Sequence, residues 1–194
     1  ALSGPDAAAF LQGQLTQDVT KLREGVALPA GWCSPKGRLI AVMQLLKDAA
    51  PDGSEVIYAV VPAGQAAMLA KRLRMYILRS KVRLDPDPGL AVAGVLGEAA
   101  GLKAWSLPSG HPDALAAFGL PAGRALALVP AGEAPAADDG AWKAASALAG
   151  EAWIAPAAQE LFTPHAVNLE LAGGVSFSKG CYTGQEVVAR VEHI

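Results

Sequence analysis

Two cysteines and a short polar run near the end of the chain carry most of the residues that could do chemistry. Cys181 lies two positions after Lys179, and the T-x-x-E pattern of Thr183 and Glu186 predicts a helix that begins about there and runs to residue 190. The N-terminus of a helix carries partial positive charge, so this charge and the nearby Lys179 both favour a thiolate at Cys181. A thiolate is the form of cysteine that acts as a nucleophile or metal ligand.

A structural interpretation of the same residues stays open at this point. Free cysteines are commonly buried as small apolar side chains, and the glycines on either side of Cys181 would then only turn the chain. Cys33 and Cys181 are far apart and too few for a secreted disulfide framework, so a reducing cytoplasm is expected. Two cysteines also cannot supply the four thiolates that hold most iron-sulfur clusters, and no metal site is predicted.

The composition indicates a folded chain with no overall attraction for polyanions. Hydrophobic residues make up 52% of the 194 residues against 18% charged, which excludes disorder by composition. The longest apolar runs are far shorter than the roughly 20 residues that a membrane-spanning helix needs. Net charge is -2, so any anion site must be local. One segment concentrates positive charge, and it could meet glutamate tails or an RNA backbone or simply be solvated: Lys71, Arg72, Arg74, Arg79, Lys81 and Arg83.

Helices and strands are expected to alternate irregularly along the chain. Ser3-Gly4-Pro5-Asp6 reads as a helix start that turns Ala7, Phe10 and Leu11 inward. A hairpin is expected within 31–46, strands at 56–61, 81–84, 91–96 and 125–129, helices at 65–74, 142–148 and 156–162, and a loop at 130–140. Because these elements lack strict βαβ order, the pattern favours an α+β fold.

Several common reaction classes lose their support because their motifs are missing. The sequence contains no Walker loop, no strand-anchored G-x-G-x-x-G, no H-E-x-x-H helix and no G-x-S-x-G elbow. The chemistry must therefore come from other residues.

The run K-G-C-Y-T-G-Q-E at 179–186 resembles the signature of the YgfZ family, which is related to the glycine-cleavage T-protein. Three further segments are similar to the family's: 162–169 to the approach segment before the signature, 10–16 to the N-terminal helix and turn, and Tyr76 to Val82 to a central basic strand. His165 departs from the glutamine expected there. A half-exposed loop histidine is the simpler interpretation of that residue.

The resemblance implies a T-protein-like (aminomethyltransferase) folate-binding fold, α+β with mixed or antiparallel sheets, over residues 1–194. It also implies two interleaved subdomains, one from about 1–85 plus 141–194 and one from 86–140. The family usually continues into a small C-terminal β-barrel, whereas this chain stops at Ile194, so the barrel is expected to be missing or unresolved.

The function implied by the resemblance is that of a tetrahydrofolate-binding accessory protein for iron-sulfur cluster assembly or repair, and thereby for tRNA modification. The bound cofactor would be tetrahydrofolate or a derivative, and the partners iron-sulfur enzymes or assembly proteins. Cys181 would be the reactive thiol, with Lys179 lowering its pKa. The folate would contact Trp142, Tyr182, Gln185 and Glu186.

Other interpretations stay open. Trp142 suits either the face of a pterin or an ordinary core position, and Glu186 could be occupied as a helix cap. A folate-dependent aminomethyltransferase is disfavoured because those relatives carry arginine where this signature has Gln185. A non-catalytic module that binds folate or RNA is the third hypothesis, and the basic segment is its support. The sequence leaves open which folate binds, whether any reaction is turned over, and the oligomeric state.

Overall fold

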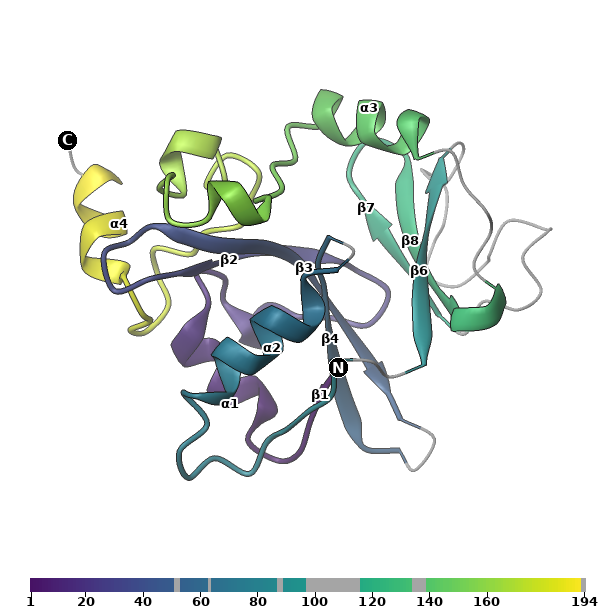
Figure 1. The fold of residues 1–194 in the computed structure, drawn as a ribbon, viewed down its shortest axis with the longest axis horizontal. Coiled ribbons are helices and arrows are strands. Elements are labelled where there is room, and N and C mark those ends of the chain that lie inside the picture. The colour runs from purple at the N-terminus through teal and green to yellow at the C-terminus, as the bar shows by residue number, and fades with distance from the viewer. Residues whose placement is uncertain (51–52, 63, 87–88, 97–115, 134–138, 193–194) are drawn as a thin grey trace.

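A five-stranded sheet organises the first part of the chain (Figure 1). The computed structural model describes residues 1–50, 53–62, 64–86, 89–96, 116–133 and 139–192. All strand pairs in this sheet are antiparallel, in the order β2-β3-β4-β1-β5. The strands are β1 (Leu2–Ser3), β2 (Leu28–Cys33), β3 (Leu39–Ala49), β4 (Glu55–Val60) and β5 (Arg83–Leu84).

Strand β3 is covered on both faces. Ala41, Met43 and Leu45 point into the largest apolar cluster, whereas Leu39 and Val42 join a second cluster with residues from the C-terminal part. Side chains of a strand alternate between its two faces, so burial on both faces requires an apolar run rather than an alternating pattern. The hairpin predicted within 31–46 is confirmed by the pairing of β2 with β3.

Two helices contribute to the first cluster. α1 (Ala7–Gln14) buries Ala7, Phe10 and Leu11 as predicted, and α2 (Ala66–Arg74) buries Leu69 and Leu73. The expected start of α1 is wrong in detail, because Ser3 belongs to β1.

The residue that precedes α1 is Asp6, and its side chain makes no cap hydrogen bond to the helix. Its carboxylate instead accepts a hydrogen bond from the backbone N–H of Lys81 at 2.6 Å. The start of α1 is thereby tied to the segment that leads into β5.

A second antiparallel sheet of order β6-β8-β7 lies beside the first (Figure 1). It comprises β6 (Leu90–Leu96), β7 (Ala116–Leu120) and β8 (Arg124–Pro130). Fully buried Phe118 packs with Leu46 of the first sheet, and Gly119 exchanges backbone hydrogen bonds with residues 25 and 27. Strand β7 was not predicted, because its sequence AAFGL is poor in β-branched residues.

The remaining chain is mostly irregular. α3 (Gly140–Leu148) covers part of the second sheet, and α4 (Gln185–Glu192) ends the described residues. Single 3₁₀ turns occur at η1 (Val19–Lys21), η3 (Ala131–Glu133), η4 (Pro156–Ala158) and η5 (His165–Val167). The helix and strand mixture confirms the predicted α+β class with antiparallel sheets, while the division into subdomains stays a prediction.

Two predicted elements differ from the structure. The helix expected at 156–162 is only the turn η4, because Leu39 of β3 binds this backbone: Glu160 N–H donates to Leu39 O at 2.7 Å and Leu39 N–H donates to Phe162 O at 2.8 Å. Glu160 itself has a left-handed φ of 63°. The basic strand expected from Tyr76 begins only at Arg83, after a series of turns.

Candidate functional site

The chain just before Cys181 is held against the turn that follows α1. The Thr16 hydroxyl donates to Gly174 O at 2.6 Å and accepts from Gly31 N–H at 2.8 Å, and the Thr16 carbonyl accepts from Ser176 N–H at 2.9 Å. Thr16 is fully buried. These three bonds join segments that are far apart in the sequence.

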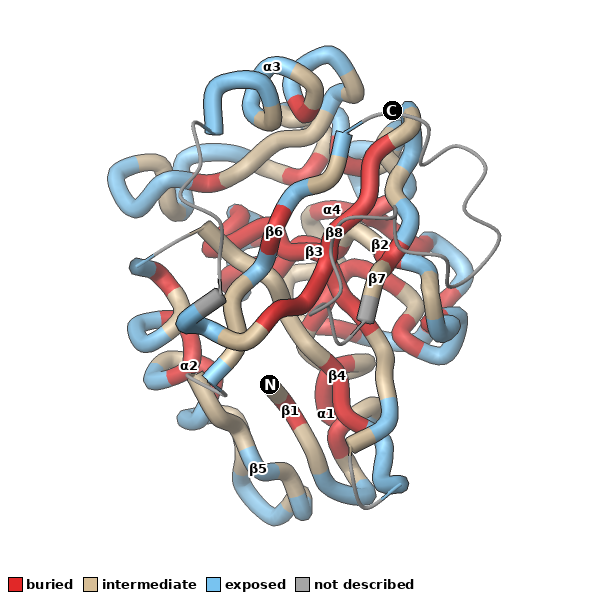
Figure 2. Tube along the Cα trace, turned by 90° about the vertical axis from the view of Figure 1, so that its right-hand side faces the viewer, coloured by how far each residue is buried: buried red, intermediate tan, exposed pale blue. Residues whose placement is uncertain are grey.

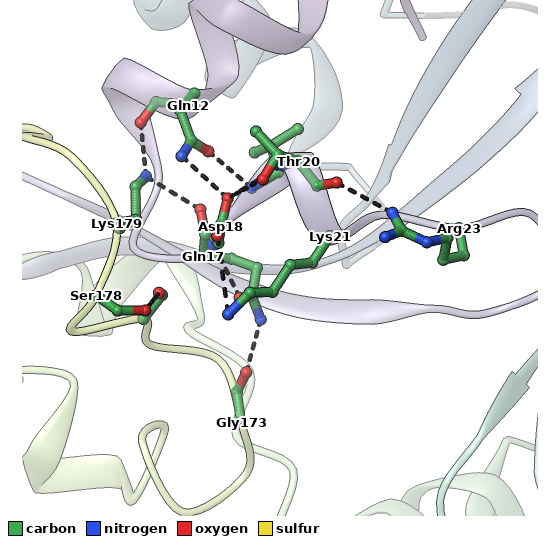
Figure 3. Close-up of polar contacts among 11 residues, drawn as sticks. Gln12, Gln17, Asp18, Thr20, Lys21, Arg23, Gly173, Ser178 and Lys179 are labelled. Atoms are coloured by element: carbon green, nitrogen blue, oxygen red, sulfur yellow. Dashed lines mark hydrogen bonds and ion pairs between the residues drawn. The ribbon is translucent and has the colours of Figure 1, made fainter.

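Gln17 adds a second attachment beside the first (Figure 3). Its amide Nε2 donates to Gly173 O at 2.6 Å and to Pro29 O at 3.0 Å, while its Oε1 accepts from Asp18 N–H at 2.8 Å. The side-chain amide is therefore used as both donor and acceptor, and residue 173 is fixed next to strand β2.

Lys179 is buried and its ammonium lies among three backbone carbonyls. The Nζ donates to Gln12 O at 2.6 Å and to Gln17 O at 3.0 Å (Figure 3). It also donates to Leu15 O at 2.6 Å, so all three ammonium hydrogens are engaged. Burial lowers the pKa of Lys179 to about 8, and the Asp18 carboxylate opposes this shift. The carbonyls lie at the end of α1, where a helix dipole favours a cation.

This geometry gives Lys179 a positioning role. No ammonium hydrogen is left for a hydrogen bond to Cys181, so Lys179 can influence that thiol only through its electrostatic field. Activation of the Cys181 thiol by Lys179 stays a prediction.

Tyr182 and Gly184 hold the other side of Cys181. Tyr182 is buried, its ring centroid lies 5.0 Å from Lys179 Nζ, and burial raises the pKa of its phenol, with the nearby Cys33 adding to the shift. Gly184 has φ +83°, and a Cβ there would lie 2.4 Å from Ser34 O. This position packs directly on the β2–β3 turn and requires glycine. Residues 176–184 are called the cysteine loop below.

The two cysteines have opposite environments. Both are free, and Cys181 is exposed whereas Cys33 is buried. Burial raises the pKa of the Cys33 thiol to about 12, which keeps it protonated and inert. The interpretation of Cys181 as a buried apolar side chain is therefore wrong, and it is Cys33 that has this environment.

The first residues of α4 follow the cysteine loop. The helix predicted there is confirmed, but it begins at Gln185, and no hydrogen bond among the described residues links Thr183 with Glu186 as a capping box. Glu186 Oε1 instead accepts from Arg190 Nη2 at 2.6 Å on the exposed face. Gln185 is half-buried. Both side chains are thus available on the surface beside the loop.

Trp142 lies away from the cysteine loop. Its ring covers Gly94 of β6, where a Cβ would lie 2.4 Å from Trp142 Cε3, and the guanidinium carbon of buried Arg124 is 5.6 Å from the ring centroid. α3 and α4 lie toward opposite ends of the longest axis (Figure 1). The structure therefore brings Lys179, Cys181 and Tyr182 together but leaves Trp142 apart, packed on the second sheet.

His165 is half-buried in the turn η5. Its ring centroid lies 6.0 Å from that of Phe177, at the edge of the cysteine loop. A packing contact accounts for this position, in line with the simpler interpretation of the histidine.

A cavity of about 220 Å³ lies where α2 and the two sheets meet. Its walls are mostly apolar, and they include Leu11, Trp32, Tyr58, Leu69, Leu73, Asp85, Leu90 and Leu128. The Trp32 indole N–H is buried without a hydrogen-bond partner among the described residues, and a bound acceptor would satisfy it. Sequence reasoning missed this site, although Trp32 in an otherwise small-residue strand was a visible signal.

A second, open hollow of about 460 Å³ adjoins the start of the cysteine loop. It is lined by Gln17, Lys21, Leu28, Gly173, Val175, Ser176, Phe177 and Ser178. The hollow therefore carries hydroxyl, amide and ammonium side chains beside the loop that bears Cys181, and the sequence did not predict that grouping.

Comparison with known proteins places the chain among curated relatives. It is 31% identical over 98% of its length to a protein of Cronobacter sakazakii, 32% over 99% to one of Edwardsiella ictaluri, and 33% over 98% to one of Escherichia coli O157:H7. Each of these is described as tRNA-modifying protein YgfZ. The chain is a homologue of the YgfZ proteins.

The similarity to YgfZ covers nearly all of this chain but not all of its relatives. The chain spans 63% to 64% of the length of those three YgfZ proteins. No family model matches the sequence. Among solved structures, the glycine cleavage system aminomethyltransferase T of Bartonella henselae aligns with 68% of this chain and 39% of its own, at 16% identity and a TM-score of 0.44.

Proposed function

We propose that this chain is the folate-binding part of an accessory protein for tRNA modification, which supports iron-sulfur enzymes through the thiol of Cys181. The observation that carries the proposal is the contrast around that thiol: Cys181 is exposed, while Lys179 and Tyr182 beside it are buried and held. An accessible thiol on a fixed loop can meet a partner with little ordering cost. The link to tRNA modification comes from the YgfZ homologues, which are named tRNA-modifying proteins.

The cavity between the sheets is the proposed position of the folate ring system. Drug-sized ligands usually occupy roughly 300–1,000 Å³, so a cavity of about 220 Å³ suits the flat bicyclic end of a reduced folate better than the whole molecule. Trp32 and Tyr58 supply aromatic surface, and the Trp32 indole N–H offers a donor to a pterin acceptor. Bound tetrahydrofolate would provide a one-carbon carrier at this place.

Three of the four folate contacts expected from the signature remain part of the proposal: Tyr182, Gln185 and Glu186. Gln185 and Glu186 lie on the surface at the start of α4, Tyr182 is buried, and none of the three lines this cavity. Trp142 stays a prediction, and packing against Gly94 and Arg124 accounts for its position. The proposal also places the protein in the cytoplasm, where reducing conditions would keep both thiols free. Within the described residues, no helix has the length and apolar character needed to cross a membrane.

Calorimetric titration with tetrahydrofolate tests the cofactor, with 5-formyl-tetrahydrofolate and a non-folate pterin as comparisons. Saturable binding that is weakened about tenfold or more by Trp32→Phe, which removes the indole donor while retaining a ring, is the expected result. Trp153→Phe, at a half-buried tryptophan that does not line the cavity, is the matched control and should retain affinity. Absence of saturable folate binding would overturn the cofactor assignment.

The thiol is tested separately in cells that lack the endogenous protein. Cys181→Ala should fold normally and fail to restore iron-sulfur enzyme activity, whereas Cys33→Ala should restore it. Full rescue by Cys181→Ala would show that the thiol is not required.

A further inference from the structure

The segment from α2 to β5 carries a positive surface that the proposed folate and thiol sites do not use. No acidic residue occurs from Val56 to Leu84, while six basic residues fall within that stretch. Two of the six are engaged: Arg72 pairs with Glu160 at 2.5 Å and lies over the Trp32 ring, and Arg74 donates to Leu84 O at 2.9 Å. The other four are exposed and have no ion-pair partner among the described residues: Lys71, Arg79, Lys81 and Arg83.

The packing of this segment turns its apolar and basic side chains in opposite directions. Tyr76, Ile77, Val82 and Leu84 pack against the first apolar cluster. Lys81 and Arg83 alternate with Val82 and Leu84 along an extended backbone, so their side chains face outward. Figure 2 shows α2 and β5 on the same side of the molecule. The segment that carries the four cations therefore runs along one side of the molecule.

The backbone beneath Lys81 and Arg83 is fixed. The Lys81 N–H donates to the Asp6 carboxylate, a Cβ at Gly4 would lie 2.3 Å from Lys81 O, and β5 pairs with β1. The charges are thus displayed by a held segment rather than by a loose tail, which reduces the ordering cost of binding.

We propose that this surface, defined by Lys71, Arg79, Lys81 and Arg83, binds the phosphate backbone of RNA. A cluster of unpaired cations on a chain of net charge -2 indicates a local polyanion site. An anionic membrane fits less well, since membrane-binding helices turn an apolar face outward, and the apolar face of α2, with Leu69 and Leu73, is buried in the core. Exposed Met75 and Leu78 add apolar contact area between the cations.

That the bound RNA is tRNA rests on the proposed role in tRNA modification. That this surface binds phosphate rests only on the exposed cations and does not depend on the proposed role. The surface also differs from the cysteine loop, because none of its four cations lies within residues 176–184. A tRNA-binding measurement without folate therefore tests this inference separately from the cofactor and the thiol.

The experiment is fluorescence anisotropy of a labelled, unmodified tRNA transcript titrated with the 194-residue chain at several salt concentrations. The variant Lys71→Gln, Arg79→Gln, Lys81→Gln, Arg83→Gln should lose at least tenfold in affinity at low salt. Each phosphate contact contributes about 0.7 to 0.9 to the slope of log K against log salt, so the slope should shrink by roughly 3. The matched control neutralises four exposed cations elsewhere and should stay within twofold of wild type: Arg23→Gln, Lys36→Gln, Lys143→Gln and Arg190→Gln.

A single reversal, Arg79→Glu, provides a second test that does not depend on the stability of the fourfold variant, and it should weaken binding about fivefold or more at low salt. Three results would overturn the inference. The first is no saturable tRNA binding by the wild-type chain. The second is an equal loss of tRNA affinity in the two fourfold variants, which would show that binding depends on net charge and not on this surface. The third is binding to vesicles of phosphatidylglycerol and phosphatidylcholine without binding to tRNA.

Discussion

The ammonium of Lys179 lies 2.6 Å from the carbonyl oxygen of Leu15, although 164 positions separate the two residues in the sequence. Together with the bonds to Gln12 O and Gln17 O, this contact fastens the cysteine loop to the end of α1. The signature lysine therefore sets where the exposed Cys181 stands.

Replacing Lys179 should destabilise the fold. Lys179→Met keeps an apolar stem but leaves three carbonyls without their donor, and we expect the free energy of unfolding to fall by about 3 kcal/mol. Urea unfolding measures this loss. Lys143→Met is the control, because the Lys143–Asp139 pair is exposed on α3 and should contribute under about 1 kcal/mol. Equal, small losses in both variants would contradict the positioning role.

The two glycines of the signature should respond differently to a methyl group. Gly184→Ala places a Cβ against Ser34 O at a left-handed φ, whereas nothing lies within 4 Å of a Cβ at Gly180. An unhindered substitution such as Gly180→Ala changes the free energy of unfolding by only about 0.5 kcal/mol. Gly184→Ala places a side chain at a left-handed φ, which costs about 1 to 3 kcal/mol, and the clash with Ser34 O adds to that cost. Thermal unfolding should therefore show a clear loss for Gly184→Ala and almost none for Gly180→Ala. Similar melting temperatures for the two variants would be evidence against this packing of the loop.

A thiol reagent should distinguish the two cysteines in the native protein. Cys181 is exposed and should react at once with an aromatic disulfide, while Cys33 should react only when the chain opens. With a stability of about 5 kcal/mol or more, that opening slows Cys33 by about a thousandfold or more. Cys181→Ser should remove the fast phase and leave the slow one. A fast phase that survives in this variant would place Cys33 at the surface.

Burial of Cys33 also predicts a pH dependence of stability. Its pKa is raised from 9.0 to about 12 in the folded state, so between these values the unfolded chain has lost a proton that the folded chain retains. Stability from this group is complete below pH 9 and falls as pH rises toward 12, by about 1.4 kcal/mol at pH 10. Comparing wild type with Cys33→Ala in urea at pH 8 and pH 10 isolates this contribution. The free energy of unfolding of the wild type minus that of Cys33→Ala should be smaller at pH 10 than at pH 8. An equal difference at the two pH values would refute the predicted contribution of Cys33.

The local elements could be read from the sequence because their signals are local. The apolar spacing of Ala7, Phe10 and Leu11 predicted α1, and the turn residues between β2 and β3 predicted the hairpin. The helix expected at 156–162 failed because backbone pairing with Leu39 outweighed its helix-forming residues, and local patterns carry no information about that partner.

The candidate site was only partly predictable for a similar reason. The signature run singled out both Cys181 and Lys179. The partners of Lys179 could not be predicted, because they are backbone carbonyls, which have no sequence signature. The cavity at Trp32 joins residues from both sheets, so it exists only once the second sheet has packed on the first.

The attachments of the cysteine loop also set an order of assembly. Until residues 173–179 have been synthesised, the Thr16 hydroxyl lacks its acceptor Gly174 O, and the carbonyls of Gln12, Leu15 and Gln17 lack the ammonium of Lys179. Synthesis proceeds from the N-terminus, so a growing chain would carry the end of α1 without these partners through most of its elongation. The reactive thiol would then reach its fixed position only when almost the whole of this chain has left the ribosome.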